Sequence, residues 1–346
     1  MAKVVGVFEM SHTPFCYMPP QVWPTIRAAR AHRADVPVDD EAASKQKYDR
    51  IQKAFAALRE QLAAVRPDAI IIFGDDQMEC FDFTNFPAFA VYVGEEFEGH
   101  TSSPAALVFD AFDSVGMKRP EGFEMPQSNG GPPPKARLKA HPALGVALLT
   151  GVMKRGFDPA FCMEMPKPEE GLGHAFMRPA ETITDMKTPI VPILLNCYFA
   201  PQISGMRSYQ LGRAVRAAID EMPGDLRVAV IGSGGLWHTP GRRNAYLDED
   251  FDKTILRYLE AGEMRKAAEY FDAYRPPADD GSQQLGPRGG ASTGMPAFGG
   301  PQGGTREICN WIAAAAVADR KPGKVVDYVP VYASPIGCGF AYWTDL

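Results

Sequence analysis

Short runs of apolar residues alternate along the chain with segments in which apolar residues recur every three or four positions. The runs are rich in Val, Ile and Phe and almost continuously apolar, which is typical of strands buried on both faces of a sheet. They cover residues 3–8, 69–73, 88–93, 190–195, 228–231 and 325–332. Their alternation with helical segments predicts an α/β fold in which helices flank a central mixed sheet.

The helical periodicity covers residues 49–65, 141–155, 209–221, 250–261 and 306–318. Gly156 and Gly262 follow two of these segments, and glycine is a common residue just after the end of a helix. Two stretches rich in Gly and Pro, 120–135 and 276–304, interrupt the pattern. Neither side of them repeats a complete fold, so we expect one domain over residues 1–346 with these stretches as long active-site loops.

The composition is that of an ordinary globular protein, with 45% hydrophobic and 23% charged residues among 346. A net charge of -6 without any run of Lys or Arg argues against a nucleic acid or an anionic membrane as partner and favours small-molecule ligands. The first ten residues resemble a strand more than a secretion signal, and no apolar stretch reaches the ~18 residues of a membrane span. The six cysteines lack CxxC spacing, which disfavours disulfides and zinc ribbons. We therefore expect a cytoplasmic protein.

Polar side chains follow the ends of four predicted strands. In chain order they are Ser11 and His12, the run 75–77 (Asp-Asp-Gln), Asn196, and the run 233–238, which ends in His238. Strand ends of such sheets open onto the ligand crevice, and imidazole suits both metal ligation and proton transfer. A mononuclear iron(II) site needs two or three N or O ligands on one face, and His12, a carboxylate and one further donor would satisfy that need.

Two of these features also have a simpler interpretation. Asp75 and Asp76 could serve as turn or helix N-cap residues. The GSGGLWH segment could be a phosphate-binding loop, although no GK[ST] follows it and the GxGxxG spacing is absent.

Eight motifs, in this order, resemble those of the class III extradiol ring-cleavage dioxygenases, the LigB family typified by the protocatechuate 4,5-dioxygenase β subunit. They are SH near the N-terminus, GDDQxExF, GHAFMRP, NCYFAPQ with SYQLGRAVRAAI, IGSGGLWHTPG, LDEDFD, GTREICNWIAAAA and VVDYVPVYASPIGCGFAYW. The resemblance implies a single LigB-like α/β domain with a non-haem mononuclear Fe(II) site. Such a site binds a catechol through both hydroxyls and O2 beside it, and the ring is cleaved next to the diol.

The resemblance also assigns roles to individual residues. His12 matches the first metal histidine, and Glu307 in GTREICNW matches the metal carboxylate. His238 matches the catalytic histidine that takes a proton from the substrate hydroxyl and later returns one, although Trp237 replaces the serine of the family's GGxSH motif.

Two further residues are assigned to the substrate. His174 matches the second active-site histidine, and Gly173 stands where the family usually has an aspartate. Ser334 matches a serine that touches the carboxylate side of the substrate in protocatechuate-type members.

One departure from the family concerns the metal. The second metal histidine of the family lies in an NDHxxxF segment, and this chain has Gln77 at that position in DDQMECF. An amide oxygen is neutral and binds iron(II) more weakly than imidazole does. Three alternatives remain: Gln77 coordinates through its oxygen, Asp76 or Glu79 takes its place, or high-affinity metal binding is lost.

These features together predict Fe(II)-dependent extradiol cleavage of a substituted catechol, an aminophenol or a hydroxypyridone with O2. A non-catalytic subunit of the same family and a divalent-metal hydrolase are the alternatives. We expect a homo-oligomer and consider a small α-type subunit as a second partner.

Overall fold

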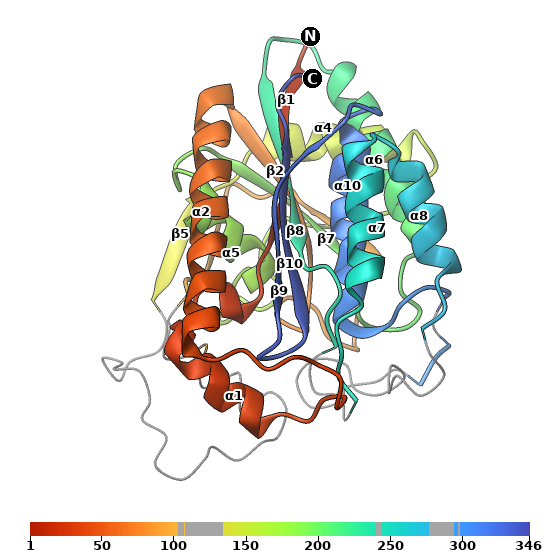
Figure 1. The fold of residues 1–346 in the computed structure, drawn as a ribbon. Coiled ribbons are helices and arrows are strands. Elements are labelled where there is room, and N and C mark those ends of the chain that lie inside the picture. The colour runs from red at the N-terminus through yellow and green to blue at the C-terminus, as the bar shows by residue number, and fades with distance from the viewer. Residues whose placement is uncertain (103–106, 108–133, 240–243, 277–293, 297) are drawn as a thin grey trace.

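An eight-stranded mixed sheet runs through the middle of the protein, with helices on both of its faces (Figure 1). The computed structural model describes residues 1–102, 107, 134–239, 244–276, 294–296 and 298–346. The strand order is β6-β3-β7-β2-β8-β1-β10-β9. The strands are β1 (Lys3–Ser11), β2 (Ala69–Asp75), β3 (Phe89–Tyr92), β6 (Ala160–Cys162), β7 (Ile190–Leu195), β8 (Arg227–Gly234), β9 (Lys324–Val331) and β10 (Ile336–Trp343). The predicted α/β fold with a central mixed sheet is confirmed.

The four central strands β7, β2, β8 and β1 are parallel to one another. They are buried on both faces, which explains why their sequences are almost continuously apolar. Strands β3 and β10 are antiparallel to their central neighbours β7 and β1. The carboxyl ends of the parallel strands therefore meet at one edge of the sheet, where ligands bind in folds of this kind.

Helices of different length cover the two faces (Figure 1). One face carries α1 (Trp23–Ala29), α2 (Glu41–Val65) and α5 (His174–Ile183), and the other carries α4 (Pro142–Met153), α6 (Gly205–Asp220), α7 (Glu249–Glu260), α8 (Met264–Ala273) and α10 (Ile308–Val317). Each face has its own apolar core, and neighbouring residues of β1 such as Val7 and Phe8 belong to opposite cores. No helix in the described part of the chain is long and apolar enough to cross a membrane.

Helix α10 lies very close to the sheet and to α6 because glycines face it. A Cβ atom at Gly212 would lie 2.0 Å from the carbonyl oxygen of Ala313, and one at Gly232 would lie 2.9 Å from the Cβ of Ala314. The alanine-rich sequence of α10 and these glycines thus allow the helix to approach β8. This approach brings the short 3-10 helix η3 (Gly303–Glu307), which leads into α10, to the end of the sheet.

Several elements differ from the predicted ones. Helix α2 begins at Glu41 rather than at the predicted residue 49. Asp40 caps this start, because its side chain accepts a hydrogen bond from the backbone N–H of Ala43 at 2.7 Å. The elements that were not predicted are strands β6 and β10, helices α1, α5 and α8, and the two-stranded antiparallel sheet of β4 (Glu96–His100) and β5 (Lys135–Lys139).

The two predicted loops are described only in part. Residues 120–133 lie outside the described residues, and residue 135 opens β5 instead of ending a loop. Of the stretch 276–304, residues 277–293 and 297 lie outside the described residues. The end of that stretch is held by Arg306, whose guanidinium donates hydrogen bonds to the carbonyl oxygens of Gly299 and Pro301.

Candidate metal centre

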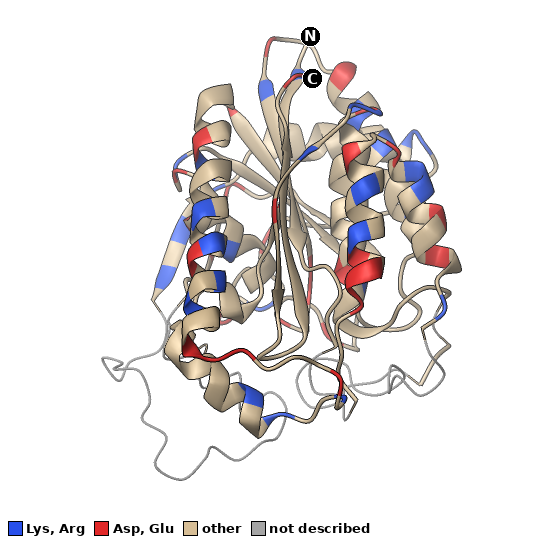
Figure 2. Cartoon of the chain, viewed as in Figure 1, with Lys and Arg blue, Asp and Glu red and all other residues tan. Residues whose placement is uncertain are grey.

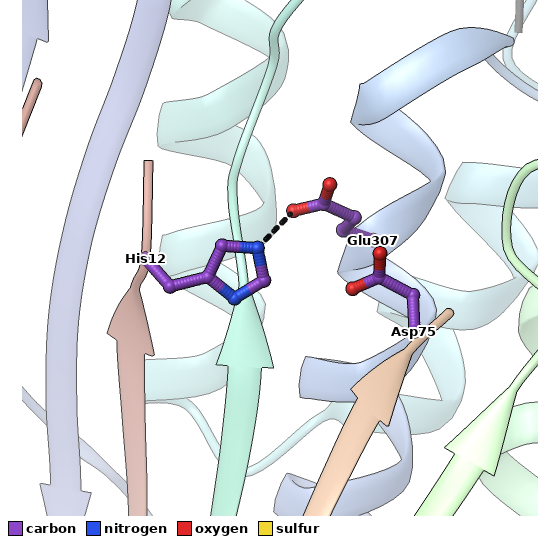
Figure 3. Close-up of side chains that lie close together, drawn as sticks. All are labelled: His12, Asp75 and Glu307. Carbon is purple, nitrogen blue, oxygen red and sulfur yellow. Dashed lines mark ion pairs between the residues drawn. The ribbon is translucent and has the colours of Figure 1, made fainter. Parts of the chain in front are cut away.

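Three side chains with metal-binding atoms converge at the carboxyl edge of the sheet (Figure 3). His12 directly follows β1, and Asp75 is the last residue of β2. Glu307 comes from η3, at the start of α10. One potential ligand atom from each of the three lies within 4.8 Å of the others, and all three side chains are buried. Residues far apart in the sequence therefore form one cluster at the ends of β1 and β2, which β8 separates in the sheet.

The imidazole of His12 is held on both of its nitrogens. Its Nδ1 lies 2.8 Å from the hydroxyl oxygen of Ser233, at the end of β8, and its Nε2 lies 3.3 Å from Oε2 of Glu307. The guanidinium of Arg178 donates a hydrogen bond of 2.7 Å to the carbonyl oxygen of His12. Ring and backbone of His12 are thus fixed by β8 and α5.

Glycines allow Glu307 to approach the end of β8. A Cβ atom at Gly234 would lie 2.9 Å from the backbone oxygen and 3.0 Å from the Cβ of Glu307. A Cβ atom at Gly235 would lie 2.9 Å from Nδ1 of His238. The glycines of GSGGLWH therefore serve close packing around the cluster, which accounts for them without a phosphate ligand.

The two carboxylates of the cluster repel each other when both are ionised. Burial, and next the charge of Glu307, raise the pKa of Asp75 to about 8. Burial by itself would raise the pKa of Glu307 as well, but His238 and His12 outweigh it and hold that pKa well below its usual value. A divalent cation between the two carboxylates and His12 would remove this repulsion, so the donor set fits a metal.

The amide of Gln77 lies against both carboxylates. Its Nε2 donates hydrogen bonds to Oδ2 of Asp75 at 3.2 Å and to Oε1 of Glu307 at 3.3 Å. The ionised carboxylate of Glu307 only accepts, so the amide nitrogen of Gln77 rather than its oxygen faces it. The structure brings Gln77 into the cluster as a donor to the carboxylates, and its predicted role as a ligand stays a prediction.

The other two residues considered for the third ligand position are engaged elsewhere. Asp76 accepts hydrogen bonds from the backbone N–H groups of Cys80 and Phe81, at 2.7 and 3.1 Å, and so closes the turn after β2. Glu79 accepts a hydrogen bond from His174. Asp75, at the end of the same strand, is the carboxylate that lies in the cluster.

His238 lies beside the cluster, on the side of Glu307. Its Nε2 is 3.3 Å from Oε1 of Glu307, and its Nδ1 donates to the carbonyl oxygen of Leu236 at 3.0 Å. The backbone N–H of His238 donates to the hydroxyl of Thr305 at 3.0 Å. Burial alone would lower the pKa of His238, but the carboxylate of Glu307 outweighs burial and the pKa is raised.

Tyr198 is a further polar residue of the cluster that was not predicted from the sequence. Its hydroxyl donates to Oε1 of Glu307 and lies 3.4 Å from Nε2 of His238. Burial raises its pKa well above the usual value, which keeps the hydroxyl protonated. Tyr198 lies in the NCYFAPQ motif after β7, where Asn196 seemed the better candidate. Asn196 instead closes a turn with the backbone N–H and carbonyl of Phe199.

The two residues assigned to the substrate lie in different places. His174 is the first residue of α5, and its ring packs edge-on against that of His12 with 4.8 Å between centroids. Ser334, after β9, is buried and accepts a hydrogen bond of 2.5 Å from the guanidinium of Arg30. The predicted substrate contacts of both residues stay predictions.

A family model described as the catalytic LigB subunit of aromatic ring-opening dioxygenase matches residues 8–279. The chain belongs to the LigB family. His12, Gln77, His174 and His238 lie within the part that matches the LigB model. Glu307 and Ser334 lie beyond it, so the fold, rather than the family match, connects Glu307 with the other site residues of this LigB chain.

Curated relatives of the LigB chain include enzymes of Escherichia coli. Two of them, from strains 55989 / EAEC and K12 / DH10B, are named 2,3-dihydroxyphenylpropionate/2,3-dihydroxicinnamic acid 1,2-dioxygenase. Each is 26% identical over 196 residues, which are 56% of this chain and 50% of the relative. The chain thus spans about half the length of the curated relatives it matches. A solved structure of an uncharacterized Escherichia coli K12 protein is 12% identical, with a TM-score of 0.39 over 83% of this chain and 91% of that one.

Proposed function

We propose that the protein is a non-haem Fe(II)-dependent dioxygenase that cleaves an aromatic ring next to a diol. The observation that carries this proposal is the buried cluster of His12, Asp75 and Glu307, whose ligand atoms lie within 4.8 Å of one another. Membership of a family of aromatic ring-opening dioxygenases supports it.

We propose His12, Asp75 and Glu307 as the metal ligands. One imidazole nitrogen and two carboxylate oxygens on one face are a donor set that accommodates iron(II) and leaves neighbouring positions open. Compared with two histidines and one carboxylate, this set carries one more negative charge. Gln77 would help to stabilise this extra negative charge, because its amide donates hydrogen bonds to both carboxylates.

Bound iron(II) would supply the centre at which the two diol oxygens and O2 meet and exchange electrons. Around it, His238 takes a proton from a substrate hydroxyl and later returns it. Tyr198 and Gln77 both donate to Oε1 of Glu307 and so orient the carboxylate that would help to hold the metal, while Oε2 lies beside His12. His238 and Tyr198 are buried, which limits the access of water to this side of the cluster.

The proposed substrates are substituted catechols and the related aminophenols and hydroxypyridones. The relatives named for 2,3-dihydroxyphenylpropionate support the catechol class. We also propose that the chain works in the cytoplasm as a homo-oligomer, with a small α-type subunit as an additional partner.

An oxygen-electrode screen of the iron-loaded protein tests this function. The panel is catechol, protocatechuate, gallate, 3-O-methylgallate, 2,3-dihydroxyphenylpropionate, 2-aminophenol and a hydroxypyridone. We expect one O2 consumed per ring opened, and no uptake by His12→Ala. Iron content after anaerobic purification is measured in parallel. A chain that retains no metal would indicate a non-catalytic subunit, and turnover without O2 uptake would indicate a hydrolase.

A further inference from the structure

The carboxylate of Glu79 is paired with a histidine that lies against the metal centre. Oε1 of Glu79 accepts a hydrogen bond from Nδ1 of His174 at 2.6 Å and a second one from the backbone N–H of His174 at 3.1 Å. Glu79 is only 9% exposed, on the turn after β2, and His174 begins α5. One oxygen thus receives both donors of the same residue, which fixes the ring relative to its own backbone.

We propose that Glu79 is a positioning residue that holds His174 in the tautomer with hydrogen on Nδ1. A carboxylate can only accept, so the nitrogen facing it must carry the hydrogen. In a neutral imidazole the other nitrogen, Nε2, is then the acceptor. Carboxylate partners fix histidine tautomers in the same way around metal sites.

Packing shows that the position of Glu79 depends on the residue before the histidine. A Cβ atom at Gly173 would lie 2.4 Å from Oε2 and 2.8 Å from the carboxyl carbon of Glu79. A side chain at position 173 and the present position of the carboxylate therefore exclude each other. The glycine and the glutamate act as a pair, although they lie far apart in the sequence.

The orientation of His174 matters because its ring packs edge-on against the ring of His12, with 4.8 Å between centroids. The role in turnover rests on the proposed ring cleavage. In that reaction His238 takes the proton of one diol hydroxyl and Nε2 of His174 takes the proton of the other. The lone pair of Nε2 forms the new N–H bond, and the electrons of the broken O–H bond stay on the substrate oxygen. The imidazolium that results is stabilised by the carboxylate already bound to Nδ1.

Nitrogen NMR of the full-length chain, labelled with ¹⁵N only in histidine and free of metal, tests the tautomer without any assay of activity. The signals of His174 are assigned by their loss in His174→Gln. His238 serves as internal reference, because its Nδ1 donates to the carbonyl of Leu236 and not to Glu79. We expect the wild-type His174 to show hydrogen on Nδ1.

Three variants distinguish the loss of the hydrogen bond between Glu79 and His174 from a general disturbance of the fold. Glu79→Ala should lose the Nδ1–H tautomer of His174 and leave His238 unchanged. Glu79→Gln should retain it, because an amide oxygen can accept both hydrogens. Gly173→Ala should weaken it with Glu79 still present, because its Cβ displaces the carboxylate. If Glu79→Ala also moves the His238 signals, that variant disturbs more than the pairing. The proposal is then tested by the wild-type tautomer and by Glu79→Gln and Gly173→Ala.

Hydrogen on Nε2 of wild-type His174, or an unchanged tautomer in both Glu79→Ala and Gly173→Ala, would overturn the proposal. With iron-loaded protein and a substrate found in the screen, kcat of Glu79→Ala should fall roughly 10–100-fold, and Glu79→Gln should recover part of it. If NMR shows the expected tautomer but the chain takes up no O2 with any substrate, the pairing of Glu79 with His174 stands and only the ring-cleavage function is refuted.

Discussion

Among single residues, Glu9 is an ionisable group in the middle of a buried strand. It has no exposed surface, and neither carboxyl oxygen makes a hydrogen bond of ordinary geometry among the described residues. Burial raises its pKa well above 4.5, and the nearby backbone of Ala315 offsets this only in part. Glu9 is therefore protonated in the folded protein at pH values where the unfolded chain is ionised.

The consequence is a dependence of stability on pH. The favourable contribution of protonated Glu9 is complete below pH 4.5 and is lost as the pH rises toward the folded pKa, at about 1.4 kcal/mol per pH unit. We expect Glu9→Gln to stabilise the protein more at pH 8 than at pH 5, measured by urea unfolding. Glu60→Gln, on the exposed face of α2, is the control. Equal effects of Glu9→Gln at both pH values would contradict this.

The third metal ligand can be identified from iron retention. If Asp75 is the ligand and Gln77 a donor to it, Asp75→Ala should abolish tight binding, whereas Gln77→Ala should cost about 10–100-fold in affinity. The measurement is iron per chain after dialysis against chelators of graded strength. A larger loss in Gln77→Ala than in Asp75→Ala would make Gln77 the ligand, and Gln77→His should then strengthen retention because imidazole binds iron(II) better than an amide.

His238 should separate catalysis from metal binding. Its Nε2 lies beside Glu307, but the residue is outside the metal cluster. His238→Phe should therefore retain iron, while kcat falls by roughly 10²–10⁴-fold because the proton acceptor is missing. Loss of iron in this variant would make His238 a ligand, and unchanged turnover would remove it from the mechanism.

At the scale of elements, helix α7 anchors the loop that carries His238. Buried Asp252 of α7 accepts a hydrogen bond of 2.7 Å from the backbone N–H of Trp237 and one of 2.8 Å from the hydroxyl of Tyr328. Asp252→Ala should lower the free energy of unfolding by about 2–4 kcal/mol, because it leaves both donors unsatisfied, and Tyr328→Phe by about 1 kcal/mol. Equal losses in urea unfolding would show that the bond to the loop contributes nothing.

The sequence predicted the helices and strands whose apolar residues form a regular pattern or a continuous run, and it missed the elements in which that pattern is interrupted. The central strands could be predicted because burial on both faces makes them continuously apolar. Strand β10 was missed because Gly337 and Gly339 break its apolar run, and helix α5 because Pro179 lies inside it. The first turns of α2 are exposed and polar, so that periodicity gave no sign of them.

The residues of the site could be predicted where a polar side chain stands at the end of a predicted strand. His12 and Asp75 stand directly at such ends, and a family motif pointed to Glu307. The sequence could not predict the pairing of Glu79 with His174, because it depends on how the turn after β2 packs on α5. The same holds for Tyr198, whose contact with Glu307 depends on the close approach of α10 to the sheet.

For the whole molecule, a bound metal would tie together segments from opposite ends of the chain. His12 directly follows the first strand, and Glu307 is the last residue of η3, just before α10. In the unfolded chain these side chains are not held together. We expect iron(II) at 100 times its dissociation constant to stabilise the fold by about 2.7 kcal/mol. Thermal unfolding under anaerobic conditions, with and without metal, measures this. Asp75→Ala should abolish the difference, and an equal gain in that variant would indicate binding elsewhere.

The chain ends lie close together (Figure 1), and Figure 2 shows many charged residues on the helices and few on the strands of the sheet. Strand β1 lies between β8 and β10, both of which come much later in the sequence. At a synthesis rate of about 5–20 residues per second, β1 waits roughly 15–65 s for its second neighbour. The metal ligands are likewise completed only when Glu307 has been added. On the proposed ligand set, iron would therefore bind only after Glu307 has been synthesised, and until β10 has been made the apolar first strand must be kept from premature pairing.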